Sequence, residues 1–139
     1  MVTNERELRL TIDMIEFDEK GLVPVIVQDV KTNAILMFAW MNRESLEKTI
    51  DTGIMTFWSR SRQKLWIKGE TSGNIQELRE MYVDCDADCI LCKVVPKGAG
   101  AACHLGYYSC FYRKLDEGRK TFEIIAKRRF DPDAVYKKQ

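Results

Sequence analysis

LVPVIVQDVKTNAILMFAWM, residues 22–41, places two apolar runs on either side of a polar tripeptide. The first run, Leu22 to Val30, is rich in valine and isoleucine and follows Gly21, a pattern typical of a strand. Lys31-Thr32-Asn33 provides a turn, after which the second run extends from Ala34 to Met41. The stretch therefore predicts a β-hairpin.

The segment after this hairpin predicts a helix. Asn42 is a candidate N-cap, Leu46 and Ile50 lie one helical turn apart, and Gly53 follows as a stop signal, which predicts a helix from about Arg43 to Thr52. Another short helix is expected in the first dozen residues, where Leu8 and Ile12 are four apart.

Short strand-like segments account for most of the remaining chain. Residues 119–130 should form the second half of a last hairpin, because Phe122, Ile124 and Ala126 alternate as in a half-buried strand. Because no strand–helix–strand alternation is present, we predict an α+β domain of mostly antiparallel sheet with few short helices. The other expected strands are 54–58, 65–68, 75–83, 89–95 and 107–115.

Composition limits the classes of protein to consider. A chain of 139 residues corresponds to one domain, expected to span residues 1–139. The net charge of +1 argues against a general attraction to nucleic acid or to a membrane surface. The longest apolar run, Ala34 to Met41, is too short to cross a bilayer, and charges occupy the position of a signal peptide. We therefore expect a cytoplasmic protein, in which five cysteines are metal ligands or free thiols.

DCDADCILC, residues 84–92, combines aspartates and cysteines at alternate positions. If residues 83–95 are extended, Asp84, Asp86 and Asp88 share one face and Cys85 and Cys89 the other. Three neighbouring carboxylates repel one another unless a cation neutralises them, and hard oxygen ligands favour Mg²⁺, Mn²⁺ or Ca²⁺. The alternative is a solvated acidic loop.

Two zinc sites are conceivable from the cysteine spacing. The C-x-x-C of Cys89 and Cys92, with Cys103 and Cys110, would make a tetrathiolate structural site. In a strand, however, Cys89 and Cys92 point to opposite faces, which favours Cys85 with Cys103 and Cys110. Three thiolates leave one position for water, as in catalytic zinc sites. His104, the only histidine, is then a candidate general base or orienter of that water.

Two polar segments suggest a phosphorylated substrate. Residues 59–62, SRSR, offer two guanidinium groups and two hydroxyls for phosphate oxygens. Residues 68–73, KGETSG, offer a cation, hydroxyls and glycines whose backbone amides can approach an anion. A zinc-stabilised nucleic-acid-binding module would use the same basic residues, but the sequence has no basic stripe. The candidate substrate-binding residues are Ser59, Arg60, Ser61, Arg62, Lys68 and Ser72.

Four blocks of the sequence together resemble one enzyme family. MNRESLEKTIDTG, WSRSRQKLWIKGETSGN, VDCDADCILCKV and ACHLGYYSCFYR follow, in order, the pattern of the phosphoribosyl-AMP cyclohydrolases, over roughly residues 20–113. The resemblance implies hydrolysis of the N1–C6 bond of the adenine ring of 1-(5-phosphoribosyl)-AMP, a step of histidine biosynthesis. It also implies an obligate cytoplasmic homodimer that needs Zn²⁺ and Mg²⁺.

The same resemblance implies a role for individual residues. Asp84, Asp86 and Asp88 would bind magnesium, which would anchor a substrate phosphate. Zinc would be shared between subunits, by Cys85 of one chain and by Cys103 and Cys110 of the other. A water activated by this zinc would attack C6, and His104 would take or relay a proton.

The sequence also departs from this pattern. Cys89 and Cys92 replace residues that are usually apolar, so we expect buried thiols without a metal. Tyr107 and Tyr108 stand where basic residues are usual, which removes a possible phosphate contact. Nothing after the last block resembles the pyrophosphohydrolase domain fused in some relatives, so a single activity is expected. A zinc nucleobase deaminase is excluded, because His104 is followed by Leu-Gly and no proline precedes Cys89.

Overall fold

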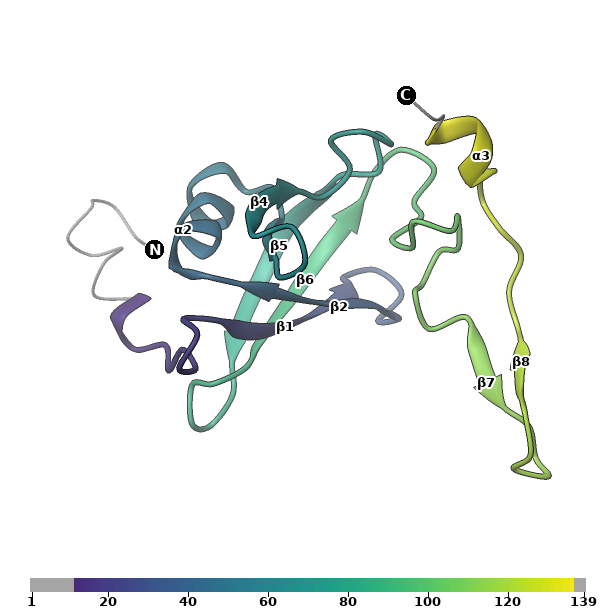
Figure 1. The fold of residues 1–139 in the computed structure, drawn as a ribbon, viewed down its shortest axis with the longest axis horizontal. Coiled ribbons are helices and arrows are strands. Elements are labelled where there is room, and N and C mark those ends of the chain that lie inside the picture. Colours follow the sequence, from purple (N-terminus) through teal and green to yellow (C-terminus); the bar gives the residue numbers. More distant parts are fainter. Residues whose placement is uncertain (1–11, 137–139) are drawn as a thin grey trace.

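The computed structural model describes residues 12–136, so the helix expected around Leu8 lies outside the described residues. Strands dominate and the helices are short, which confirms the predicted α+β class. The helix predicted at Arg43 to Thr52 is confirmed, and the hairpin at residues 22–41 forms as expected. In chain order the elements are β1 Val23–Asp29, β2 Ile35–Met41, α2 Arg43–Thr52, β3 Thr56–Ser59, β4 Lys64–Ile67, β5 Gln76–Val83, β6 Ile90–Pro96, β7 Arg113–Leu115, β8 Phe122–Ile124 and α3 Pro132–Val135 (Figure 1).

The main sheet has four strands in the order β2-β1-β6-β5. β1 pairs antiparallel with β2 and β5 pairs antiparallel with β6, whereas the central pair of β1 and β6 is parallel. In this register Val25 lies between Ala39 of β2 and Ile90 of β6. The turn from β5 to β6 therefore lies at one end of the sheet, and the chain that leaves β6 lies at the other, beside the start of β2 (Figure 1).

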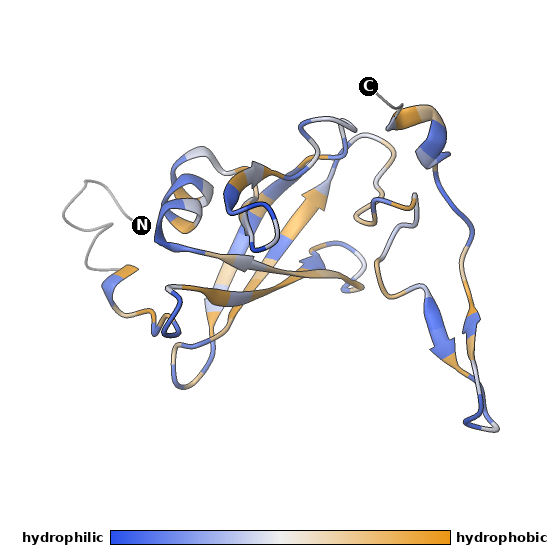
Figure 2. Cartoon of the chain, in the orientation of Figure 1, coloured by the Kyte–Doolittle hydropathy of each residue, from blue (hydrophilic) through white to orange (hydrophobic). Residues whose placement is uncertain are grey.

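One face of this sheet carries the core. Val23, Val25 and Val27 alternate with half-buried residues along β1, as the period of a strand requires, and each is fully buried. Apolar residues follow β1 and β6 through the centre of the molecule (Figure 2). Leu46 of α2 and Phe57 of β3 belong to the same cluster. Burial of each such large side chain contributes about 1.5–3 kcal/mol to folding.

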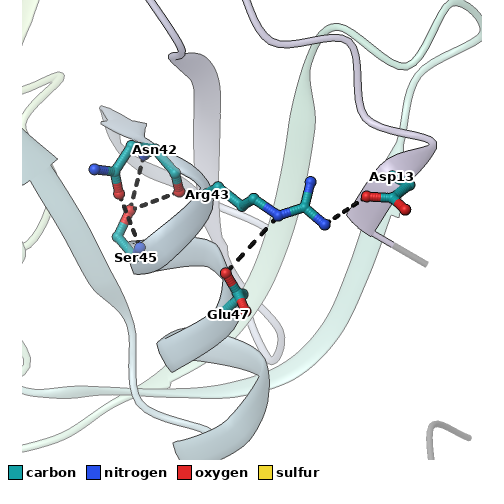
Figure 3. A network of polar contacts seen from close by, with 5 residues as sticks. All are labelled: Asp13, Asn42, Arg43, Ser45 and Glu47. Atoms are coloured by element: carbon teal, nitrogen blue, oxygen red, sulfur yellow. Dashed lines mark hydrogen bonds and ion pairs between the residues drawn. The ribbon is translucent and has the colours of Figure 1, made fainter. Parts of the chain in front are cut away.

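The helix α2 begins at a complete capping box. The Asn42 side chain accepts a hydrogen bond from the backbone N–H of Ser45, while the Ser45 hydroxyl accepts one from the backbone N–H of Asn42 (Figure 3). Gly53 ends the helix in the left-handed conformation, at φ 75°. Arg43 adds ion pairs with Asp13 and Glu47, which are solvent-exposed and contribute little. Local sequence signals therefore determine both ends of α2.

The last hairpin forms, but its predicted burial is wrong. β7 and β8 pair antiparallel as expected, with Leu115 opposite Phe122. Every residue of both strands is exposed, including Phe122 and Ile124. The hairpin extends away from the main sheet, so no core lies beneath its apolar residues (Figure 1).

Among the described residues, no helix has both the length and the apolar character needed to span a bilayer.

Candidate functional site

The segment after β6 brings two cysteines together in what we call the thiol loop, residues 101–110. The backbone N–H of Cys103 donates to the carbonyl of Tyr107 at 3.1 Å, closing a tight loop. The backbone N–H of Cys110 donates to the carbonyl of Leu36 at 2.7 Å, which fixes this residue at the start of β2. Cys103 is buried, whereas Cys110 retains exposed surface. Partial desolvation by the surrounding residues and the nearby Cys103 thiol raise the pKa of Cys110 to about 11.

Lys68 lies against this pair of thiols. It is almost fully buried, and its Nζ donates a hydrogen bond to the carbonyl of Ala102. Burial lowers the pKa of Lys68, while the nearby Cys110 and Cys103 partly offset that effect. An ammonium group in this position favours the thiolate forms that a metal requires. The sequence pattern predicted only that Lys68 contacts substrate, and did not indicate this position beside the cysteines.

A hollow of about 430 Å³ opens next to the thiol loop, and we call it the first hollow. His104 and Cys110 line it from the thiol loop, and Tyr136 lines it from the end of the described chain. Gly69 is required in the opposite wall, because a Cβ there would lie 2.3 Å from the backbone of Asn74. The predicted substrate-binding residues in this hollow are Arg62, Lys68 and Ser72.

The second hollow, of about 520 Å³, contains the other predicted substrate-binding residues, Ser59, Arg60 and Ser61. The guanidinium of Arg60 lies 4.7 Å above the ring of Trp40. Both hollows share Phe38 and Trp66, so they lie side by side. The structure therefore arranges the six predicted residues in two neighbouring groups with aromatic side chains between them.

These aromatic residues were missed in the sequence. Phe38 and Trp40 alternate with buried residues along β2, and Phe38 is 47% exposed. An apolar run with large aromatic residues on the outward positions of an edge strand is a signal that could have indicated them. Phe57 packs against Trp66 at a ring distance of 5.0 Å and so supports it from the core.

Residues 84–89 form a turn between β5 and β6, which we call the acidic turn. The expected extended strand from 83 to 95 is wrong, because β5 ends at Val83 and β6 begins at Ile90. Ala87 adopts a positive φ of 60°, which reverses the chain. Asp84 accepts hydrogen bonds from the backbone N–H groups of Asp88 and Cys89, at 3.0 and 3.2 Å.

The turn nevertheless brings the three predicted carboxylates together. Ligand oxygens of Asp84, Asp86 and Asp88 all lie within 4.8 Å of one another, and all three residues are exposed. Hydrogen bonds with the Asp86 and Asp84 carboxyl groups, aided by charge repulsion, raise the pKa of Asp88 to about 6. Slight desolvation of Asp84 is outweighed by the donors from Asp88 and Cys89, so its pKa is lowered. Three convergent oxygen donors with unfavourable mutual charge suit a divalent cation.

Cys85 does not join Cys103 and Cys110 within one chain. It lies in the acidic turn, at the end of β6 opposite to the thiol loop (Figure 1). Among residues 12–136, the aspartates of the acidic turn are the one group of three or more His, Cys, Asp or Glu side chains whose ligand atoms converge. The tetrathiolate site considered from the C-x-x-C spacing is likewise not assembled in this part of the chain.

The structure shows the surroundings of the four residues that differ from the pattern of the family that the sequence resembles, namely Cys89, Cys92, Tyr107 and Tyr108. Cys92 is buried in β6, as predicted, and burial raises its pKa to about 12. Cys89 is only half-buried. Tyr107 stacks on Tyr112 at 3.7 Å, and the Tyr108 hydroxyl donates to Asp29 at 2.6 Å. Both tyrosines therefore hold the thiol loop in place.

Comparison with known proteins gives one consistent result. The family model described as phosphoribosyl-AMP cyclohydrolase matches residues 37–112, which include the acidic turn, the thiol loop and every lining residue of the two hollows except Tyr136. A protein of this name from Chlorobium limicola is 55% identical over 128 residues, 92% of this chain and 91% of the relative. Namesakes from Chlorobium phaeobacteroides and Chlorobaculum tepidum are 52% and 49% identical over all of this chain and 99% of each relative.

Proposed function

Since the chain belongs to the phosphoribosyl-AMP cyclohydrolase family, hydrolases of histidine biosynthesis, we propose that it opens the adenine ring of 1-(5-phosphoribosyl)-AMP by hydrolysing the N1–C6 bond. The product is the ring-opened formimino-aminoimidazole-carboxamide ribonucleotide. The observation that carries this proposal is the convergence of Cys110, His104 and Lys68 on the first hollow, next to Cys103. All four residues lie inside the region that the family model matches.

The cysteines fit a zinc ion by the chemistry of their donors. Cys103 and Cys110 lie close enough for each thiol to affect the other, and thiolate sulfur is a preferred zinc ligand. Cys85 would supply a third thiolate. Zinc bound in this way would polarise a water molecule and lower its pKa towards neutrality. Lys68 offsets part of the negative charge that the thiolates accumulate, and its hydrogen bond to Ala102 holds the loop beside them.

His104 is the group that moves the proton. Its imidazole is exposed in the first hollow, where it can accept a proton from the attacking water. The water oxygen bonds to C6, the C6–N1 bond breaks, and His104 returns the proton to N1. The water oxygen becomes the carbonyl oxygen at C6, and the exocyclic amine remains as the NH₂ of a carboxamide. The second water proton is released to solvent as this carbonyl forms, because the N1-substituted adenine carries a positive charge that the product lacks.

The two hollows provide for the rest of the substrate. Its name in this family implies two phosphoribosyl groups, one on each side of a purine. Arg62 and Ser72 in the first hollow and Arg60 in the second have the donors that phosphate requires. Phe38 and Trp66, shared by both hollows, offer aromatic surface to the purine between them.

Magnesium is proposed at the acidic turn. The carboxylates of Asp84, Asp86 and Asp88 supply only oxygen donors, which Mg²⁺ prefers, and a cation would relieve the repulsion that raises the pKa of Asp88. Its role would be to bind a substrate phosphate together with the basic residues of the hollows.

The position of Cys85 supports the proposal of a homodimer. Because this thiol lies at the opposite end of β6 from the thiol loop, one chain does not assemble a three-thiolate site. Cys85 of the partner subunit can complete the site if two chains associate with an acidic turn against a thiol loop. Two identical sites then result from one symmetric interface.

Incubation with phosphoribosyl-AMP tests the function. Ring opening, followed by ultraviolet absorbance, should require bound zinc and stop when a chelator removes it. Cys103→Ala should lose zinc and turnover together, whereas Cys89→Ala, a matched change outside the proposed ligand set, should retain both. An active, zinc-free Cys103→Ala enzyme would contradict the assignment.

A further inference from the structure

Residues 111–127, which we call the arm, form a hairpin that extends from the body of the molecule (Figure 1). β7 and β8 pair with each other, and neither belongs to the main sheet. Most of the arm follows residue 112, where the match to the family model ends. A two-stranded hairpin is at best marginally stable in water unless it packs against something else.

The arm has one apolar face. The pairs Leu115 with Phe122 and Arg113 with Ile124 fall on the same side of the hairpin. Leu115, Phe122 and Ile124 are 40%, 66% and 61% exposed, so residues 12–136 leave much of their apolar surface uncovered. The opposite side carries the oppositely charged pair Lys114 and Glu123. An uncovered apolar strip beside a polar face is typical of an interaction surface.

Both ends of the arm are fixed to the thiol loop. Its first residue directly follows Cys110. Just beyond its last residue, the backbone N–H of Arg129 donates to the carbonyl of Gly106 at 2.6 Å. The approach is so close that a Cβ at Gly106 would lie 2.3 Å from the carbonyl oxygen of Phe130. Arg129 also lies 4.2 Å above the ring of Tyr108. The arm therefore leaves and rejoins the body of the molecule at the loop that presents both cysteines (Figure 1).

We infer that the apolar face of the arm packs against a second copy of this chain and holds the partner's acidic turn at the thiol loop. This inference rests on the proposed sharing of the zinc site. If Cys85 of the partner subunit reaches Cys110, the arm begins beside the partner's acidic turn. The net charges of the two segments are complementary. The arm has five Lys and Arg against three Asp and Glu, whereas the acidic turn has three Asp and no basic residue.

Two double variants of the full chain test the inference by sedimentation. Phe122→Ser with Ile124→Ser alters the apolar face, and Lys114→Ser with Glu123→Ser is the matched control on the other face. The unchanged protein should sediment at twice the 16.2 kDa of one chain. The apolar-face variant should dissociate with a constant roughly 10⁴-fold higher or more, since each dimer loses four buried apolar side chains. The control should stay within about threefold of the unchanged protein.

Wild-type dimer affinity in the apolar-face variant would overturn the inference, and so would equal weakening by both variants. Hydrogen exchange on the unaltered protein gives a second measurement that does not depend on how a variant folds. Amides of residues 113–124 should be protected only at concentrations where the dimer forms; rapid exchange in the dimer would overturn the inference too. If the dimer forms equally well without the apolar face of the arm and still hydrolyses phosphoribosyl-AMP, this inference fails and the proposed function stands. If the dimer depends on the arm but does not hydrolyse phosphoribosyl-AMP, the proposed function alone is contradicted.

Discussion

Lowering the pH from 7 to 5 should weaken Mg²⁺ binding at the acidic turn about tenfold, because Asp88 must lose a proton to bind the ion. The pKa of Asp88 is raised to about 6 by its hydrogen bonds with Asp86 and Asp84 and by their charge. With that value, roughly 90% of Asp88 is protonated at pH 5 and roughly 10% at pH 7. Since only the deprotonated form binds, the ratio of the two deprotonated fractions gives the factor.

The titration of Asp88 also determines how the stability of the metal-free protein changes with pH. A carboxyl group whose pKa is raised in the folded state favours that state most below its ordinary value of 3.8. This contribution to folding is lost as the pH rises through about 6, where Asp88 becomes charged beside its neighbours. Mg²⁺ removes the repulsion, so it should raise the melting temperature more at pH 7 than at pH 5.

Calorimetric titration with Mg²⁺ at several pH values measures the affinity directly. Asp88→Asn should bind more weakly and lose the pH dependence between 5 and 7, because it has no proton to release. Glu123→Gln, which removes an acid from the arm, should keep the wild-type profile. An affinity that is constant between pH 5 and 7, or that increases on acidification, would refute the reasoning.

Three further substitutions test other parts of the site and its support. Lys68→Met should lower zinc affinity by about 10-fold or more in competition with a chromophoric chelator, and unchanged affinity would show that its charge does not act on the thiols. Thr49→Val should cost about 1–3 kcal/mol in urea unfolding, since its buried hydroxyl accepts from the Thr56 N–H at 2.9 Å; unaltered stability would contradict this. Gln76→Met should stabilise by about 1 kcal/mol, because the buried Oε1 of Gln76 has no hydrogen-bond partner within residues 12–136; destabilisation would show that the amide is needed.

Local sequence signals predicted much of the fold. Asn42 and Gly53 bound α2 because capping depends on the residues at the two ends and on little else. The strand at 22–30 was predictable from its apolar pattern. The acidic turn was not, because alternating aspartates fit a strand equally well, and a positive φ at Ala87 has no sequence signature.

The candidate site was likewise predictable from the sequence only in part. Cys103, His104 and Cys110 were identified from residue type and spacing, and the structure brings them to one loop. Lys68 was assigned to substrate, but its position beside the thiols depends on its contact with Ala102 of the thiol loop, which is distant in sequence. The alternation of Phe122 and Ile124 correctly indicated a strand. Such an alternation does not indicate whether another part of the chain covers the apolar face of that strand.

Complementation between two inactive variants tests the central claim, that each active site takes Cys85 from one chain and Cys103 and Cys110 from another. Cys85→Ala and Cys103→Ala should each be inactive alone. After mixing in equal amounts and exchange of subunits, half of the dimers are mixed, and each of these has one intact site and one that lacks both cysteines. We expect the mixture to recover about a quarter of the wild-type turnover per chain. No recovery after demonstrated subunit exchange, or full activity of Cys85→Ala alone, would contradict a site shared between subunits.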